Sequence, residues 1–300
     1  MCRFDPYFHI DPYFHNYYEK GSSVMNVEAY RDAGTELSQR LHLPTTPVAV
    51  TYVKKEDDIP KKALRPSAQG QKWSLCQAFT YARRWGWHVA MTADDNICVP
   101  ASAMHHWVDV SAEDFIQSQV EQGWHRDRES EQNRYNFGQS LFQGPKGEER
   151  LKKLEACVGF VCSPLPKTLL EPDTVLVFGD GAHVTHLIHA LTYDYKMPVL
   201  SSFEGFGETC IKGGMVPFVT GRPQVVIPGM GDRAFSGVQD HELAVGIPAK
   251  MIPEVLDNLF KSGGPLNMGL PVKPMLATGL TESITPGFAF LKKKVDEKSG

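Results

Sequence analysis

Apolar residues along the chain gather in short runs, and these runs predict the strands of a sheet. The segments 156–162 and 174–178 are continuously apolar, which is typical of strands buried on both faces. The run at 47–53 is rich in β-branched residues, which favour strands. The full set of predicted strands is 47–53, 87–91, 156–162, 174–178, 198–203, 224–227 and 241–247.

Between these runs, apolar residues recur with the helical spacing of about 3.6 residues. The helices expected from this spacing are 27–43, 75–85, 181–195 and 253–260. The segment 111–150 is polar, and it predicts a helical insertion that docks through Phe115, Val120 and Trp124. Strands that alternate with helices predict an α/β or α+β fold with flanking helices and a mixed, partly parallel sheet.

The chain is expected to form one globular domain over residues 25–262, with a lobe inserted at 111–150. Residues 1–24 contain a repeat, Asp5-Pro-Tyr-Phe-His9 and Asp11-Pro-Tyr-Phe-His15. We interpret them as an extension outside the fold, with a metal- or partner-binding arm as the alternative. Residues 263–300 are a tail that is rich in Gly and Pro and ends in a charged segment.

Composition and charge exclude several classes of protein. The 300 residues include 31 basic and 35 acidic side chains, so the net charge is −4. Nucleic-acid binding requires clustered cations and is not expected here. The sequence lacks a long apolar stretch and a basic start followed by an apolar run, which predicts no membrane partner, no signal peptide and a cytoplasmic location. Six cysteines are too few for a disulfide scaffold, so we expect free thiols or ligands.

Several short segments stand out when they are taken in order along the chain. They are Pro47-Val-Ala-Val50, Leu75-Cys-Gln-Ala78, Cys98-Val-Pro100, Glu171-Pro-Asp-Thr-Val-Leu-Val-Phe-Gly179, Ser201-Ser-Phe203 with Cys210, Thr220-Gly-Arg-Pro-Gln224, Gly231-Asp-Arg233 and Asp240-His-Glu-Leu-Ala-Val-Gly-Ile-Pro248. Together they resemble the domain-of-unknown-function family 169 (DUF169) of prokaryotic proteins over about residues 44–259. The resemblance implies a shared fold and supplies no activity. The chain departs from the family at Gly229, where many members carry a cysteine, so a four-cysteine site does not transfer directly.

Cys76, Cys98 and Cys210 are the leading candidate ligands. All three fall outside the predicted strands, and thiolates are soft ligands that select zinc, copper(I) or iron–sulfur clusters. With the resemblance, their loop placement predicts a [4Fe–4S] cluster whose fourth position is open or is taken by His183 or Glu208. Zinc with one open position is an alternative, and three buried, inert thiols are another. Cys157 and Cys162 are expected to pack in the core.

Two loops carry further candidate groups. Gly179-Asp-Gly-Ala-His183 lies between a predicted strand and a helix, where ligands often bind in open sheets. The loop from Glu204 to Cys210 could form a pocket with it. In Gly231-Asp-Arg233, Arg233 and Asp232 are the candidate catalytic residues, and Arg233 would bind an anionic substrate. A structural ion pair is the alternative for this Arg.

These observations together predict an iron–sulfur protein of redox character that binds or acts on a small anionic molecule. Such a protein would exchange electrons with a partner. A small-molecule binding or regulatory module without catalysis is the first alternative, and a zinc-dependent enzyme is the second. The sequence leaves the substrate unnamed, and it leaves open whether the chain forms a homo-oligomer.

Overall fold

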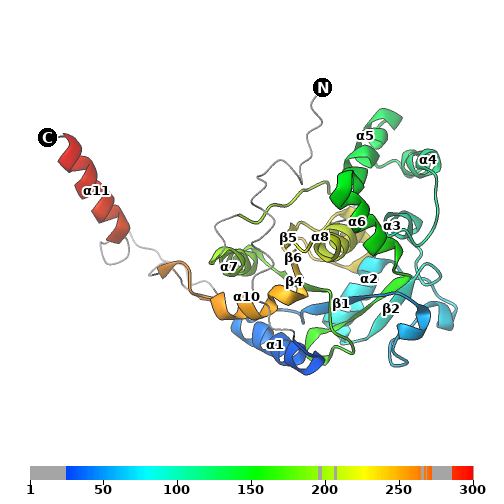
Figure 1. Cartoon of the computed structure of the whole chain (residues 1–300), viewed down its shortest axis with the longest axis horizontal. Helices are drawn as coiled ribbons and strands as arrows, with labels where there is room; N and C mark the ends of the chain where they lie inside the picture. The colour runs from blue at the N-terminus through cyan, green and yellow to red at the C-terminus, as the bar shows by residue number, and fades with distance from the viewer. Residues whose placement is uncertain are drawn as a thin grey trace.

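The computed structural model describes residues 25–194, 198–205, 208–264, 267, 269–271 and 286–299. Within these residues the chain folds as an α+β protein around a six-stranded sheet with the order β2-β3-β1-β4-β6-β5 (Figure 1). The strands are β1 Val48–Val53, β2 Val89–Thr92, β3 Gly159–Pro164, β4 Thr174–Gly179, β5 Gln224–Val226 and β6 Leu243–Pro248.

Every pair of neighbouring strands is antiparallel, so the expectation of a partly parallel sheet was wrong. Parallel pairing among the described residues is limited to two isolated bridges, Leu64 with Val89 and Trp73 with Asn96. β3 and β4 do run in the same direction, but β1 lies between them and pairs antiparallel with both. The continuous apolar runs reflect burial of both faces, which a helix-covered antiparallel sheet shares with a parallel one.

Apart from α11, the described helices lie on both faces of the sheet and at one end of it. The α-helices are α1 Val27–Arg40, α2 Leu75–Thr80, α3 Val99–Met104, α4 Ala112–Gln122, α5 Arg128–Gln139, α6 Gly144–Glu155, α7 Gly181–Thr192, α8 Val216–Thr220, α9 Met230–Ser236, α10 Ile252–Asn258 and α11 Pro286–Ser299. The π-helices are η4 Tyr81–Trp85 and η7 Glu208–Met215. The short 3-10 helices are η2 Glu56–Asp58, η3 Ser67–Gln69, η5 Ser140–Phe142, η6 Leu165–Lys167 and η8 Ala249–Met251.

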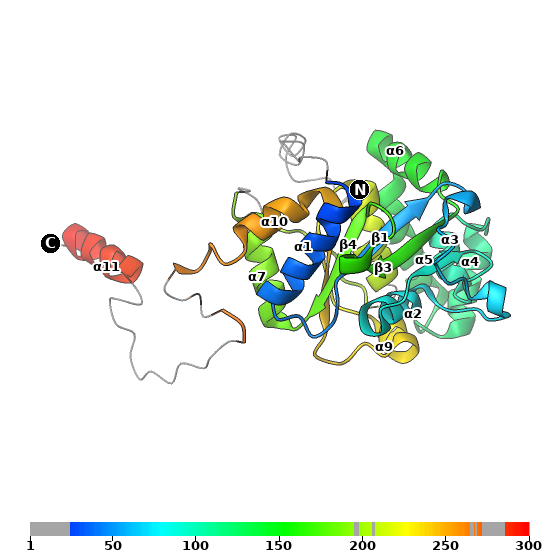
Figure 2. The ribbon, with the colours of Figure 1, turned by 90° about the horizontal axis from the view of Figure 1, so that it is seen from below.

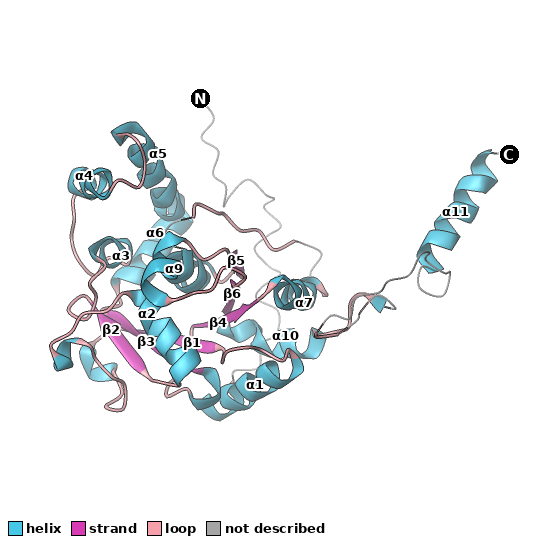
Figure 3. Cartoon of the chain, turned by 180° about the vertical axis from the view of Figure 1, so that it is seen from behind, coloured by secondary structure: helices cyan, strands magenta, loops and turns pink. Residues whose placement is uncertain are grey.

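Alternate residues of the strands enter hydrophobic clusters on opposite faces of the sheet, and at the β2–β3 end the second face carries a small cluster of Val53, Ala90 and Val161. On one face, Val48 and Val50 of β1 pack in a core to which α2, α6, η7 and α8 contribute. On the other face, Ala49 packs in a core formed with α1, α7 and α10. Figure 3 shows α1, α7 and α10 on one side of the strands and α2 and α9 on the other. Because the side chains of a strand alternate between its two faces, the position of a residue in the strand determines which core its side chain enters.

The segment 111–150 is helical, as its polar pattern predicted. Ser111 and Asp127 cap α4 and α5 by accepting backbone N–H bonds, and Gly123 ends α4 in the left-handed conformation. Phe115 is buried, and Val120 and Trp124 are partly buried. α4 and α5 lie next to α3 at one end of the molecule, whereas α11 lies apart from the body (Figure 2).

Two sequence-based boundaries were wrong. The predicted strand 198–203 is irregular, because its contacts with β5 use side chains: Ser201 Oγ accepts the Val225 N–H, and Leu200 O accepts from Gln224 Nε2. Cys157 precedes β3 and does not share the strand of Cys162, although both thiols are buried.

Residues 1–24 and 195–197 lie outside the described residues. Among the described helices, none combines the length and apolarity needed to cross a bilayer.

A buried ion pair fixes η4 to the sheet. Arg83 donates from both terminal nitrogens to Glu242, with Nη2 at 2.9 Å from Oε2, and its guanidinium lies 4.1 Å from the centre of the Phe178 ring. Arg84 donates to the same carboxylate at 3.0 Å. Burial alone would raise the pKa of Glu242, but the hydrogen bond from Arg83, the N–H group of Gln239 and the charges of the two arginines outweigh burial and lower this pKa to about 2.

Replacing Glu242 by Gln is expected to lower the free energy of unfolding by about 3 kcal/mol, because Arg83 stays buried without its counter-charge. The ordinary pKa of this carboxyl is 4.5, so the unfolded chain binds the proton at a higher pH than the folded chain. The stabilisation is therefore present above about pH 4.5 and is lost as the pH falls toward about 2. Urea unfolding of wild type and E242Q over this range measures both effects.

The control is Glu113→Gln, which removes an exposed ion pair with Arg128 and should change stability by less than about 1 kcal/mol. Equal decreases in the free energy of unfolding of the two variants would contradict the expectation that the buried ion pair stabilises the fold more than the exposed one.

Candidate functional site

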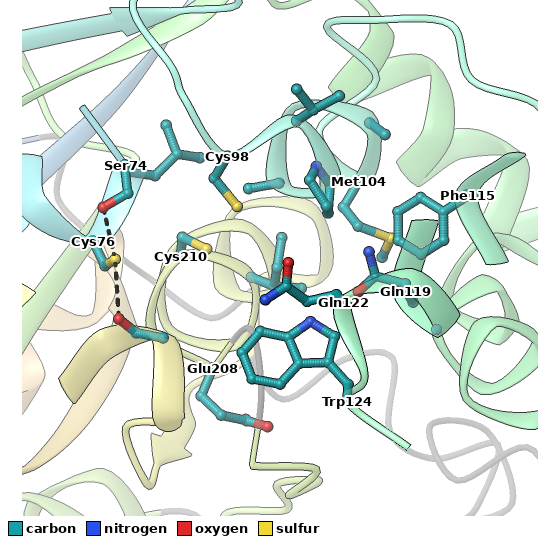
Figure 4. Close-up of a pocket in the computed structure, with 18 of the residues that line it drawn as sticks. Ser74, Cys76, Cys98, Met104, Phe115, Gln119, Gln122, Trp124, Glu208 and Cys210 are labelled. Atoms are coloured by element: carbon teal, nitrogen blue, oxygen red, sulfur yellow. Dashed lines mark hydrogen bonds between the residues drawn. The ribbon is translucent and has the colours of Figure 1, made fainter. Parts of the chain in front are cut away.

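A cavity of about 1040 Å³ lies beside the sheet face that carries α2 and η7 (Figure 4). Cys76, Cys98 and Cys210 all line it, although they come from three separate segments. Figure 4 shows their sulfur atoms facing the same part of the cavity. The structure therefore brings together the three thiols that the sequence singled out.

Cys76 is held in the first turn of α2. Ser74 caps this helix in a reciprocal pair with Gln77. The hydroxyl of Ser74 lies 3.1 Å from Cys76 Sγ, and the carbonyl oxygen of Gly231 in α9 lies 4.0 Å from the same sulfur. The packing of α2 against α9 therefore places this thiol at the cavity wall.

Cys98 occupies the N-cap position of α3, and Asn96 fixes it there. The backbone N–H of Cys98 donates to Asn96 Oδ1 at 3.0 Å, and Asn96 Nδ2 donates to Cys98 O and to Ser102 Oγ, each at 2.9 Å. Asn96 is itself buried, so these bonds fix the loop that begins the helix.

Cys210 is placed by a close approach between η7 and β6. A Cβ atom on Gly246 would lie 2.1 Å from the carbonyl oxygen of Gly213, so the backbones touch where both residues lack a side chain. A Cβ on Gly213 would meet Leu176 Cδ2 at 2.7 Å. Glycine at both positions lets a π-helix, a form that is frequent at functional sites, lie flat on the sheet.

Burial keeps the three thiols protonated. It raises the pKa of Cys76 to about 12, and it also raises the pKa values of Cys98 and Cys210. The carboxylate of Asp232 is the second cause for Cys76 and Cys210 and contributes at Cys98 too. A bound cation would reverse this effect, because it favours the thiolate.

Asp232 lines the same cavity and is almost fully buried. Its Oδ2 accepts the N–H groups of Gly229 at 2.9 Å and Thr209 at 3.3 Å. Burial nevertheless raises the pKa of Asp232 to about 6. Asp232 thus brings a proton-exchanging carboxyl group to the thiol wall. The family's frequent cysteine before this segment is Gly229 here, whose N–H binds Asp232.

Arg233 is the next residue of α9, but its side chain takes a different direction. Its Nη1 donates to Gln239 O at 2.6 Å and lies 3.6 Å from Asp240 Oδ1. It is not among the cavity-lining residues. Successive helical residues point about 100° apart, and here Asp232 faces the cavity while Arg233 points toward Gln239 and Asp240.

His183 is not brought to the cysteines. It lies in the first turn of α7, which packs on the opposite face of the sheet, and its Nδ1 is 2.6 Å from Asp180 Oδ1 in the N-cap of that helix. Over the described ranges, no three His, Cys, Asp or Glu side chains are close enough to hold a single metal ion.

Glu208, the other candidate for a fourth ligand, does line the cavity. Its Oε1 accepts the N–H groups of Glu204 at 2.9 Å and Gly205 at 2.7 Å. Its Oε2 is buried and has no hydrogen-bond partner among the residues that the structure describes. Burial raises the pKa of this carboxyl, and the N–H group of Glu204 lowers it in part.

The α4–α5 lobe supplies a wall that the sequence did not assign to a site. Figure 4 shows Phe115, Gln119, Gln122 and Trp124 projecting from it beside the thiols, together with Met104 of α3. The three-residue spacing of Gln119 and Gln122 places both amides on one face of α4. The three-residue spacing of these two glutamines was the available sign of a site, but it is hard to recognise in the sequence because the whole segment is polar.

Replacing Gly246 by Ala is expected to lower the free energy of unfolding by about 3 kcal/mol, because the new methyl group collides with the backbone of Gly213. The displaced η7 should also make Cys210 react faster with iodoacetamide. Urea unfolding and mass spectrometry of the alkylated peptides measure the two effects. The matched control is Gly181→Ala, where a Cβ meets nothing within 4 Å. If both variants unfold at the same urea concentration, the contact is not required.

Comparison with known proteins identifies the family. The chain is 22% identical to the uncharacterized protein MJ0308 of Methanocaldococcus jannaschii over 120 residues, which are 37% of this chain and 52% of the archaeal protein. This chain therefore spans about half the length of that relative. No solved structure matches the chain significantly. The family model described as "Uncharacterised ArCR", DUF169, matches residues 36–258. Since this match covers well over half of the chain, the protein belongs to the DUF169 family.

Proposed function

We propose that this protein is an iron–sulfur protein of redox character, in which Cys76, Cys98 and Cys210 hold a [4Fe–4S] cluster at the wall of a ligand-binding cavity. The observation that carries the proposal is that three thiols from distant segments line one cavity. Cysteines that serve only as small apolar residues have no reason to converge in this way.

The donor set suits a cluster better than a single ion. Iron–sulfur clusters are held by thiolates, and their own iron and sulfide atoms fill the space between ligands that are too far apart for one ion. Four carboxyl residues line the cavity, and the fourth position would be open or taken by one of the two buried ones, Asp232 or Glu208. When bound, the cluster would supply one-electron transfer, and an open fourth position would supply an iron site for a ligand.

The chain's own residues would perform the remaining tasks. Asp232, with its pKa near 6, holds or releases a proton at the thiol wall near neutral pH. The apolar lining contributed by Met104, Phe115 and Leu141 excludes water from the small molecule that binds there. The three thiols must lose their protons when the cluster binds, so assembly would be favoured by alkaline conditions.

The proposal includes a cytoplasmic location and an electron-transfer partner. The described cysteines are free, which suits a reducing compartment. Ile97, Val99 and Phe235 line the cavity and are each more than half exposed, so they form an apolar rim on which a redox partner could dock close to the thiols.

The second candidate is a small-molecule binding or regulatory module without a metal. The apolar lining favours it, because a site that holds only a drug-sized ligand is built in this way. In that case the raised pKa values would keep the thiols neutral, as part of the apolar wall. A zinc-dependent enzyme is the third possibility, and the same experiment separates all three.

Anaerobic purification followed by iron, acid-labile sulfide and zinc assays is the decisive measurement. We expect about four iron and four sulfide per chain and a broad visible absorbance in the wild type. Cys76→Ser, Cys98→Ser and Cys210→Ser should each lose most of both, because each removes a soft ligand.

The matched control is Cys157→Ser, a buried thiol outside the cavity whose Sγ donates to Lys153 O, a bond that a hydroxyl can keep. It should retain full iron and sulfide. Stoichiometric zinc without iron would favour the zinc enzyme, and a metal-free protein with intact thiols would favour the binding module.

A further inference from the structure

The inner wall of the cavity contains an unsatisfied hydrogen-bond acceptor. Glu208 is 1% exposed, and its Oε1 is occupied by two backbone N–H groups of the 204–205 turn. Its Oε2 has no partner within the described part of the chain. Buried polar oxygens are nearly always hydrogen-bonded, so an orphaned one at a cavity wall indicates a bound group that is a donor.

Two of the three cations that line the cavity, Lys212 and Arg134, are already engaged with other carboxylates. Lys212 Nζ donates to Glu204 Oε1 at 2.6 Å and to Ser202 Oγ at 3.0 Å. Arg134 Nη1 lies 3.3 Å from Glu131 Oε2 and donates to Gln119 Oε1 at the same distance. Neither interaction satisfies Glu208, and both neutralise charge that an anionic ligand would need.

The remaining charge of the inner wall is acidic. Glu208 and Asp232 are both buried there, and none of the described side chains forms an ion pair with either. The other two charged lining residues, Lys72 and Asp114, are exposed and of opposite sign. An anion in this cavity would face two carboxyl groups at short range, whereas a donor or a cation would be stabilised by them.

The rest of the cavity suits an apolar, planar body. Phe115, Trp124 and Tyr135 from the α4–α5 lobe supply aromatic surface, and Met104 and Leu141 supply aliphatic surface. The cavity is large enough for a molecule of two or more rings. Aromatic side chains favour flat partners, and they also favour cations that lie over their faces.

We propose that this cavity binds ring-containing, largely apolar molecules that carry an amine or amidine N–H group, and that Glu208 Oε2 accepts the hydrogen bond from that group. The proposal rests on the proposed function only in taking the cavity as the ligand-binding site, and it leaves the fourth cluster position open or to Asp232. It makes Glu208 a specificity-determining residue. The ligand is then expected to carry a hydrogen-bond donor, and not the negative charge expected from the sequence.

The test uses three probes of equal size and different polar groups: 2-naphthamidine, 2-naphthamide and 2-naphthoate. Each is titrated by calorimetry at pH 8, where the amidine is cationic and the carboxylate anionic. We expect the wild type to bind the amidine most tightly, the amide next and the naphthoate at least about tenfold more weakly than the amidine. Glu208→Gln should weaken amidine binding about tenfold and leave the amide nearly unchanged, because its side-chain carbonyl still accepts.

The matched control is Asp114→Asn, which removes the same formal charge from an exposed lining residue and should preserve the order of the probes. The wild-type order is informative even if Glu208→Gln does not fold. Naphthoate binding as tightly as naphthamidine, an unchanged amidine affinity in Glu208→Gln, or no binding of any probe would each overturn the inference.

The titrations are repeated on protein reconstituted anaerobically with iron and sulfide, and on Cys76→Ser. If the donor preference holds while no iron or sulfide is incorporated, the cluster proposal fails and this inference stands. If a cluster forms but the naphthoate is preferred, this inference alone fails.

Discussion

The contact between the backbones of Gly213 and Gly246 is the constraint on which the candidate site depends. It allows η7 to lie directly against β6, and η7 carries Glu208, Cys210 and Lys212 toward the cavity. A side chain at either glycine would enlarge the spacing between helix and sheet. The thiol of Cys210 would then move away from those of Cys76 and Cys98, which are fixed independently by Ser74 and Asn96.

The two-sided burial of the sheet explains both what the sequence predicted and where it misled. The apolar runs located all six strands, because both faces of the sheet carry buried clusters. Strand direction is not encoded in such runs, so the antiparallel arrangement could not be obtained from them. The segment 198–203 has the apolar character of a strand, but its serine and carbonyl groups bind β5 without forming a backbone ladder. Tertiary hydrogen bonding of this kind leaves no periodic signal in the sequence.

The site was predicted in part for the same reason. Family motifs identified Cys76, Cys98 and Cys210, but no spacing within the sequence could show that their segments converge. Asp232 faces the cavity and Arg233 binds Gln239 because of the orientation of α9. A three-residue motif does not determine that orientation. His183 was an attractive ligand because it begins a helix after a buried strand. Its helix, α7, lies on the far face of the sheet. The apolar residues of β4 and α7 that pack together determine this face, and the short motif around His183 does not.

The side-chain pairing of Ser201 with β5 also bears on how copies of this protein can meet. β5 is one edge of the sheet, and the segment 198–204 occupies part of it through Ser201 and Leu200. At the opposite edge, Leu64 exchanges backbone hydrogen bonds with His88 and Ala90 beside β2. Exposed edges are the usual sites of strand-to-strand aggregation, and irregular segments cover part of each one here. Strand-to-strand pairing of two copies is therefore hindered along those parts of the sheet edges that Ser201, Leu200 and Leu64 occupy.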